Sequence, residues 1–430
     1  MLKKLSANSS LVRNILTLFT GSTIAQAIPV LISPLLTRLY PVSDFATLTV
    51  VTTLFSLVGV IVAGRYEIGI GLPADDKEAR QLVYLSMIIS VGVSLCSFVL
   101  LIFFRHPIAS LLNNPDAANY FLFVPLSALM YGFYQALSYW NIRKRNYTVF
   151  AATRISQSAA NSGVSLGYAF TGGGLNGLVF GNVAGIFASM ALSWFKIKPA
   201  DKLTFDKSDT DKETLKKLAV KYGDLPRVNG LHALSDMMQS SLIIFIISGF
   251  FGAIATGLYG LTMRILQAPL TVIGSSFSII FYKEVSEKIN KKQKITKLLW
   301  STISTLAFIS LPLFIILMIF GPDLFEFAFG ATWREAGVYA RILSPWLFLN
   351  FIASPVSHLP VILNKQRQFF AFSLLGNLTV VLSLAIGSIF FDDIISGLIL
   401  VACSQVLFQA SMIFYFVHIA RIAENANNAS

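Results

Sequence analysis

The chain has 430 residues, of which 55% are hydrophobic and only 13% are charged, and its mean hydropathy is +0.69. A soluble domain carries roughly 25% charged residues, so this composition excludes a soluble globular protein and indicates a polytopic membrane protein. The net charge of +12 does not predict a nucleic-acid partner, because the basic residues gather in alternate connections between apolar stretches.

Twelve apolar stretches are long enough to cross a bilayer as helices, since a hydrocarbon core of roughly 30 Å needs about 20 apolar residues. In chain order they cover residues 15–36, 45–62, 82–104, 120–139, 151–171, 175–195, 228–251, 253–281, 298–320, 338–363, 369–391 and 394–417. We therefore expect an all-α polytopic membrane protein with about twelve transmembrane helices.

Lysine and arginine are unevenly divided between the two sides of the predicted bundle. Most of the 33 lie in the two termini or the even-numbered loops, and the opposite loops hold only Arg38, Arg105 and Arg334. Because loops rich in Lys and Arg stay in the cytoplasm, both termini are predicted to be cytoplasmic. The first apolar stretch is of span length and no convincing cleavage site follows it, so we expect it to remain as the first helix.

The longest hydrophilic connection divides the spans into two sets of six. We predict an N-terminal six-helix lobe over residues 1–195, a cytoplasmic linker over 196–224 and a C-terminal six-helix lobe over 225–430. Each half holds an even number of spans, so the two lobes would be parallel repeats related by a pseudo-two-fold axis along the membrane normal.

The linker carries the pattern of one short helix. Thr210 and Glu213 have the spacing of a capping box, which marks a helix start. Leu215 and Leu218 follow at helical spacing, with lysines beside them. We predict a basic amphipathic helix lying on the inner membrane surface, with a solvated charged linker as the alternative.

Polar side chains inside the spans are the default site candidates, because such groups are costly in a bilayer. The seventh span carries four of them at steps of three, four and three, on one helical face: Asn229, His232, Asp236 and Gln239. The fifth span repeats this pattern more weakly with Arg154, Gln157 and Asn161.

The helix rise places Asp236 of the seventh span and Arg264 of the eighth near the membrane midplane. One interpretation is a buried ion pair between adjacent antiparallel helices, without a role in transport. The other is a water-filled cavity in which Arg264 binds a phosphate and Asp236 or His232 supplies a titratable or cation-binding group. The two interpretations are compatible with each other.

The sequence contains no signature of catalysis or metal binding. We find no nucleophile elbow, zinc motif or nucleotide-binding loop, and the outer loops are too short for an external catalytic domain. Cys96 and Cys403 both fall inside predicted spans, which argues against a disulfide or a cysteine metal site. We therefore expect neither an enzyme nor a bound cofactor.

Several short motifs are spread over the whole chain. They are RN at 13–14, TGSTIAQAIP at 20–29, TRLY at 37–40, GRYEI at 64–68 leading to LP at 72–73, FFG at 250–252, GLY at 257–259, Arg264, Pro269 and FY at 281–282. Together these motifs resemble the bacterial polysaccharide flippases, the Wzx or O-antigen flippase family of the multidrug/oligosaccharidyl-lipid/polysaccharide exporter (MOP) superfamily.

This resemblance implies two six-helix lobes around a central cleft and transport by alternating access. The implied substrate is an undecaprenyl-diphosphate-linked oligosaccharide, moved across the bacterial inner membrane for the synthesis of O-antigen, capsule or exopolysaccharide. The implied partners are this lipid-linked oligosaccharide, membrane lipids, and the polymerase and chain-length proteins of the same pathway. Coupling to protons, to sodium ions or to no ion stays open.

The resemblance also implies a cationic cavity, for which this sequence offers Arg38, Arg154 and Arg264 as diphosphate-binding residues. A lipid-linked sugar also needs amides for its hydroxyl groups, and the candidates are Gln26, Asn161 and Gln239. Arg65 and Glu67 belong to the motif at the cytoplasmic end of the second span.

Two other functions compete with this interpretation. A cation-coupled multidrug antiporter of the same superfamily would favour carboxylates with few opposing arginines, whereas the predicted midplane holds both signs. A membrane polysaccharide polymerase, glycosyltransferase or ligase generally needs a sizeable outer loop, which this chain lacks. A scaffolding protein would not need the polar face of the seventh span.

Overall fold

A computed structural model describes the chain except for residues 1–8, 202, 204–210, 292, 364 and 430. Within this described part the regular structure is helical and no strand is found. The helices form two compact units, residues 1–257 and 258–430. The sequence-based lobe boundaries at residues 195 and 225 stay a prediction.

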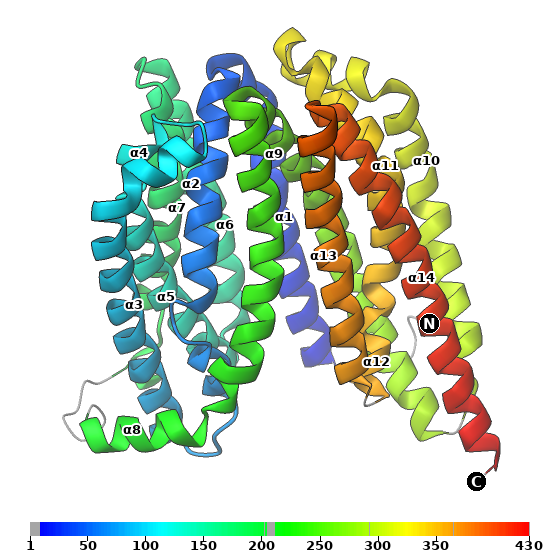
Figure 1. Ribbon diagram of the computed structural model, residues 1–430. Coiled ribbons are helices and arrows are strands. Elements are labelled where there is room, and N and C mark those ends of the chain that lie inside the picture. The colour runs from blue at the N-terminus through cyan, green and yellow to red at the C-terminus, as the bar shows by residue number, and fades with distance from the viewer. Residues whose placement is uncertain (1–8, 202, 204–210, 292, 364, 430) are drawn as a thin grey trace. The chain divides into compact units, whose positions relative to one another are not determined.

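The first unit contains seven long helices and several short ones (Figure 1). In chain order these are α1 (Ser9–Leu39), α2 (Val42–Ile61), the 3-10 helix η2 (Tyr66–Gly71), α3 (Asp76–Leu111), α4 (Ala117–Tyr120), α5 (Phe123–Arg143), α6 (Tyr147–Phe170), α7 (Leu175–Phe195), the 3-10 helix η3 (Pro199–Asp201), α8 (Lys212–Lys221), the π-helix η4 (Leu225–Gly230) and the first part of α9 (Leu231–Asn290). Within this unit α4 and α8 lie at opposite ends.

The second unit begins within α9 and is also helical. Its further helices are α10 (Thr296–Phe329), the 3-10 helix η5 (Ala331–Trp333), α11 (Arg334–Ala353), the 3-10 helix η6 (Ser354–His358), α12 (Leu359–Ile362), α13 (Gln366–Phe391) and α14 (Ile394–Ala429). Close packing here uses small residues, as is common between membrane helices. Gly321 of α10 and Gly337 of α11 meet backbone to backbone, and the hydroxyl of Thr262 donates to the carbonyl of Ala336 at 3.0 Å.

Gly252 divides α9 into two helices. Its backbone has φ 76° and ψ −169°, a combination that is essentially restricted to glycine. The predicted spans 228–251 and 253–281 meet at this residue, so the predicted break is confirmed.

The described residues hold ten segments that are long and apolar enough to cross a membrane. One of them, Leu225–Gly274, contains the break at Gly252 and therefore two helices. The 24-residue helix α6 is not among the ten, because it is rich in polar residues. With these two additions, the expectation of about twelve spanning helices is confirmed.

The polar helix α6 packs closely on α7 through two glycines. A Cβ atom on Gly185 would lie 2.6 Å from the carbonyl oxygen of Gln157, and one on Gly181 would lie 2.7 Å from that of Asn161. Glycine is needed at both positions because the two backbones approach so closely. This contact fixes the face of α6 that carries Asn161.

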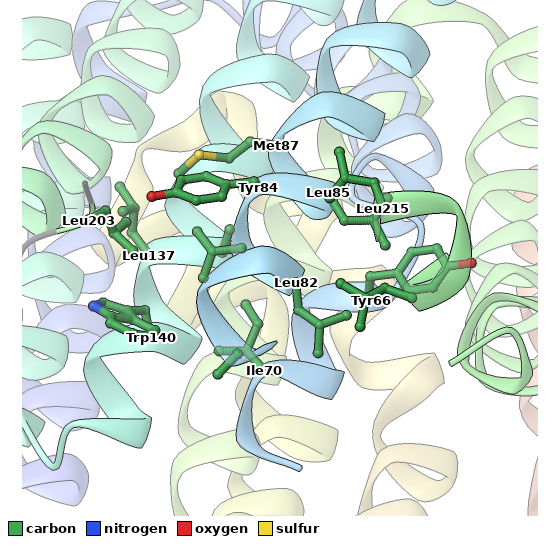
Figure 2. Close-up of a cluster of buried hydrophobic side chains, with 14 of the residues drawn as sticks. Tyr66, Ile70, Leu82, Tyr84, Leu85, Met87, Leu137, Trp140, Leu203 and Leu215 are labelled. Atoms are coloured by element: carbon green, nitrogen blue, oxygen red, sulfur yellow. The ribbon is translucent and has the colours of Figure 1, made fainter. Parts of the chain in front are cut away.

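One end of the first unit is held together by a cluster of buried apolar side chains (Figure 2). They come from η2, α3, α5, α8 and the segment before α8. The cluster includes Tyr66, Ile70, Leu82, Tyr84, Leu85, Met87, Leu137, Trp140, Leu203 and Leu215. η2 is therefore fixed on two spanning helices and on α8.

The helix predicted in the linker is present as α8, and its position on the inner membrane surface stays a prediction. Leu215 and Leu218 are buried in the cluster of Figure 2, and the Tyr66 hydroxyl donates to the carbonyl of Ala219 at 3.0 Å. These two leucines of the apolar face thus pack on protein. The predicted cap, Thr210, lies outside the described residues, and the side chain of Asp211 accepts the N–H of Thr214 at 3.4 Å.

Candidate functional site

The polar residues expected on one face of the seventh span form a continuous stripe on η4 and α9. Asn229 and Asp236 are exposed, and His232 and Gln239 are half-buried. His232 Nδ1 lies 3.2 Å from Asp236 Oδ2, one helical turn away. A polar pair of this kind is costly against lipid, so this face of the apolar helix is expected to adjoin water.

Arg65 joins the end of this stripe to the segment that follows α2. Gly64 and Arg65 both have φ of 62°, a left-handed conformation that is uncommon for a non-glycine residue. This turn directs the Arg65 side chain toward η4. Its Nε and Nη2 donate to Asn229 Oδ1 at 3.1 and 3.0 Å. Two candidates separated by 164 positions are thus brought into contact.

Glu67 is the most deeply buried carboxyl group at this end of the unit, with an exposed fraction of 1%. Its Oε1 lies 3.9 Å from Arg65 Nη1, and its Oε2 has no hydrogen-bond partner among the described residues. Burial raises the pKa of the Glu67 carboxyl above its ordinary value, against smaller opposing effects of its own backbone N–H and of Arg65. An unpaired buried carboxylate is costly, so this arrangement favours the neutral carboxyl.

The predicted stripe of α6 is divided by the structure. Arg154 is exposed, and its guanidinium lies over the Phe150 ring at 5.2 Å. Asn161 is half-buried against α7, and its Oδ1 accepts the hydroxyl of Ser165 at 3.4 Å. Arg154 therefore keeps an exposed side chain, while Asn161 is engaged in helix packing.

The two candidates on α1 differ in exposure. Gln26 is half-buried and Arg38 is exposed at the helix end. The TRLY motif that contains Arg38 is fixed on α6, because the Tyr40 hydroxyl donates to the carbonyl of Ser165 at 2.6 Å.

Arg264 lies in the second unit, on the second part of α9, and is half-buried. The ion pair considered between Arg264 and Asp236 would join the two units, and it stays a prediction. Within the first unit, Asp236 is paired with His232.

Sequence reasoning missed the role of Arg143, which it counted only among the basic loop residues. Its guanidinium donates to the carbonyls of Ile70 at 3.2 Å and Pro73 at 2.7 Å, and to Asp76 Oδ1 at 3.0 Å. Arg143 therefore fixes the turn between η2 and α3. No local signal separates such an arginine from a basic anchor.

Sequence reasoning also missed Glu78, which connects α3 to the end of α8. The carboxylate of Glu78 pairs with Lys221 and accepts the Tyr222 hydroxyl at 3.0 Å.

The described part of the chain contains no group of three or more His, Cys, Asp or Glu side chains that could hold a metal ion. Cys96 and Cys403 are free and exposed.

The sequence matches a family model described as polysaccharide biosynthesis protein over residues 35–338. This match covers more than half of the chain. No curated protein matches the chain significantly.

Several solved structures share the fold over nearly the whole chain. An inward-facing multidrug resistance MATE family transporter of the MOP superfamily has a TM-score of 0.71 and 13% identity, with 96% of both chains covered. A MOP superfamily transporter from Pyrococcus furiosus has a TM-score of 0.63 and 13% identity, again with 96% of both chains covered. The lipid II flippase MurJ, in an inward closed conformation, has a TM-score of 0.69 and 13% identity over 94% of this chain and 87% of that chain.

These structures are of transporters and a flippase rather than enzymes, in agreement with the expectation from the sequence. The expected two-lobed superfamily fold is likewise confirmed. The chain is a multi-pass membrane protein of the polysaccharide biosynthesis protein family, with the fold of the MOP superfamily transporters.

Proposed function

We propose that this protein is a flippase that moves undecaprenyl-diphosphate-linked oligosaccharide repeat units across the bacterial inner membrane. The observation that carries the proposal is the polar stripe of α9, with its His232–Asp236 pair, in a chain of the polysaccharide biosynthesis protein family. A fold shared with a lipid II flippase supports the same substrate class. The product would supply the polymerase and chain-length proteins of a surface polysaccharide pathway.

The physical task of such a flippase is to shield a diphosphate and several sugars from hydrocarbon while the polyprenyl chain stays in lipid. Arginine suits the diphosphate because its planar fork binds phosphate oxygens in pairs. In the first unit Arg38 and Arg154 both present exposed side chains. Tyr40, two residues after Arg38 in the TRLY motif, binds α6 at Ser165, roughly 16 Å along the helix from Arg154. The two arginines would therefore contact the diphosphate at different depths.

The topology belongs to the same proposal. Both termini, η2 and α8 would face the cytoplasm, as the distribution of Lys and Arg predicts. Reporter fusions after Ala118 and after Asp393 should report the periplasm, and a fusion after Lys207 should report the cytoplasm. A periplasmic signal at Lys207 would contradict this orientation.

A cation-coupled multidrug antiporter is the second candidate, because MATE transporters share this fold. The His232–Asp236 pair would suit exchange of a cation. Deleting the gene separates the two functions. We expect loss of one surface polysaccharide, with its lipid-linked repeat unit accumulating on the inner leaflet. Normal polysaccharide together with altered drug sensitivity would instead support the antiporter.

Arg264 allows a sharper test of the site. Arg264→Lys keeps the charge but loses the fork, so export should fall if Arg264 binds diphosphate. The double variant Arg264→Gln with Asp236→Asn removes both charges, so an ion pair between these two residues, if formed, would leave no unpaired charge behind to destabilise the protein. We expect this variant to be present in the membrane and inactive. Export near the wild-type level would reduce the two residues to a packing role.

A further inference from the structure

The second unit carries a polar contact of its own between two spanning helices. Gln409 of α14 donates through Nε2 to Asn350 Oδ1 of α11 at 3.3 Å. Both residues are half-buried, and both lie in segments long and apolar enough to cross a membrane. The bond uses one N–H of Gln409 and the oxygen of Asn350, so the other half of each amide, Gln409 Oε1 and Asn350 Nδ2, stays available.

Trp346 adds a donor on the same face of α11. It lies one helical turn before Asn350, so the two side chains point to the same side of the helix. Trp346 is 8% exposed, and its Nε1 has no hydrogen-bond partner among the described residues. A buried N–H without a partner is unfavourable. An acceptor from outside the described residues would therefore stabilise this donor.

The neighbouring glutamine of α14 is engaged with a different helix. Because one spanning helix separates α11 from α14, the two cross the membrane in the same direction, and Trp346 and Gln405 each lie one turn before the bonded amides. Nε2 of Gln405 donates to the carbonyl of Gly376 at 3.2 Å and to Thr379 Oγ1 at 3.0 Å, both on α13. Gln405 is 3% exposed. It therefore holds α14 on α13, whereas the available groups of its neighbours face α11.

The chemistry of these available groups selects among the parts of a lipid-linked sugar. Trp346 Nε1 and Asn350 Nδ2 are donors, Gln409 Oε1 is an acceptor, and none carries a charge. A hydroxyl group both donates and accepts, so neighbouring sugar hydroxyls can use all three. A diphosphate accepts only and is better matched by arginine, and a polyprenyl chain uses neither kind of group.

We propose that Trp346, Asn350 and Gln409 form a site in the second unit that binds sugar hydroxyl groups of the lipid-linked substrate. The inference rests on the proposed function and deepens it, because it assigns sugar recognition to α11 and α14 and leaves the diphosphate to the arginines. If the three residues served helix packing alone, their loss would affect every lipid equally.

The test compares two lipids that differ only in the sugar, bound to full-length protein in nanodiscs. They are undecaprenyl-diphosphoryl N-acetylglucosamine and undecaprenyl diphosphate. Wild type should bind the sugar-bearing lipid more tightly. Gln409→Met should weaken binding of that lipid about five-fold, the equivalent of one net hydrogen bond of about 1 kcal/mol, and should leave binding of undecaprenyl diphosphate unchanged. Trp346→Phe should act in the same way.

Gln405→Met is the matched control, since it changes the same residue type one turn away on the same helix. It removes the contacts with α13, so it should lower the amount of folded protein and keep the wild-type ratio of the two affinities. A wild-type ratio in Gln409→Met, or an equal change of the ratio in Gln405→Met, would overturn the site.

A second measurement does not depend on the stability of a variant at the amides. Wild-type protein labelled with 5-fluorotryptophan gives a fluorine resonance for Trp346, which Trp346→Phe identifies by its loss. This resonance should shift with the sugar-bearing lipid and not with undecaprenyl diphosphate, and equal shifts with both lipids would contradict the site. If wild type bound neither lipid, the proposed function itself would fail, and this site with it.

Discussion

The two polar stripes of the first unit have similar spacing in sequence and different environments in the structure. On α6, Asn161 is half-buried against α7 and accepts a hydrogen bond from Ser165. On α9, Asp236 is exposed and pairs with His232 of its own helix. A polar face thus predicts that a spanning helix avoids lipid, but it does not predict whether protein or water covers that face.

The difference arises from the neighbouring helix. Gly181 and Gly185 of α7 lie opposite Asn161 and Gln157 and allow backbone contact. This contact covers part of the α6 stripe and leaves Arg154 exposed. The α9 stripe keeps two of its four members exposed. The different environments of the two stripes can therefore be tested by three kinds of change: in the glycines of α7, in the polar side chains of α6 and α9, and in the segment around η2 that contacts Asn229.

The largest effect is expected from filling the contact between α6 and α7. In Gly185→Leu even the new Cβ would lie 2.6 Å from the Gln157 carbonyl oxygen, so the helices must separate. Overpacking of this kind typically costs about 1–3 kcal/mol, occasionally more. We expect a large loss of folded protein, measured as monodisperse protein extracted from the membrane.

The control for that variant is Gly163→Leu on α6, where a Cβ would meet open space. It should leave the amount of folded protein near the wild-type level. Equal yields of Gly185→Leu and Gly163→Leu would contradict the close packing of α6 on α7.

The next effect separates the two stripes by function. Asp236→Asn should abolish most polysaccharide export while the protein remains folded, because it removes the charge from the exposed pair. Asn161→Ala should mainly destabilise, by about 1 kcal/mol, the typical net value of one hydrogen bond. Export normalised to protein abundance checks both variants. A larger loss of normalised export in Asn161→Ala than in Asp236→Asn would contradict the different roles of the two stripes.

A moderate effect is expected at the turn between η2 and α3, which Arg143 fixes. Arg143→Lys cannot reproduce the fork that binds the carbonyls of Ile70 and Pro73 and the Asp76 carboxylate. Unsatisfied groups of this type cost about 1–3 kcal/mol. The melting temperature should fall, and Lys144→Gln is a neighbouring control that removes a charge but leaves these carbonyl contacts intact. A similar fall in both variants would indicate a general charge effect.

The smallest effect concerns Glu67 and has a defined sign. Burial raises its pKa in the folded state, so its favourable contribution is fully present below the unfolded pKa and is lost as the pH rises through the folded pKa. Glu67→Gln lacks this loss. Its melting temperature relative to wild type should therefore increase from acidic to alkaline pH, and a constant difference would contradict a buried titrating carboxyl.

The sequence predicted those features that depend on local patterns. The break at Gly252 was visible because a glycine separates two apolar runs of span length. The linker helix was visible from its periodicity, but an amphipathic pattern does not identify what its apolar face meets, and Leu215 and Leu218 proved to be buried in protein.

The candidate site was predicted only as a set of residues. Asn229, His232, Asp236 and Gln239 follow from helical spacing, whereas the bond from Arg65 to Asn229 joins positions 164 residues apart. No local pattern determines such a contact, which depends on the packing of η2 and η4.

The central claim is that the α9 stripe adjoins water while Asn161 of α6 is packed against α7. Its most direct test is the labelling rate of single cysteines by a membrane-impermeant maleimide, in full-length protein in nanodiscs. The background carries Cys96→Ser and Cys403→Ser, since both native thiols are exposed. A thiol reacts as its thiolate, which forms in water rather than in lipid or packed protein. We predict fast labelling of Asp236→Cys and slow labelling of Asn161→Cys, and equal rates or the reverse order would contradict the account.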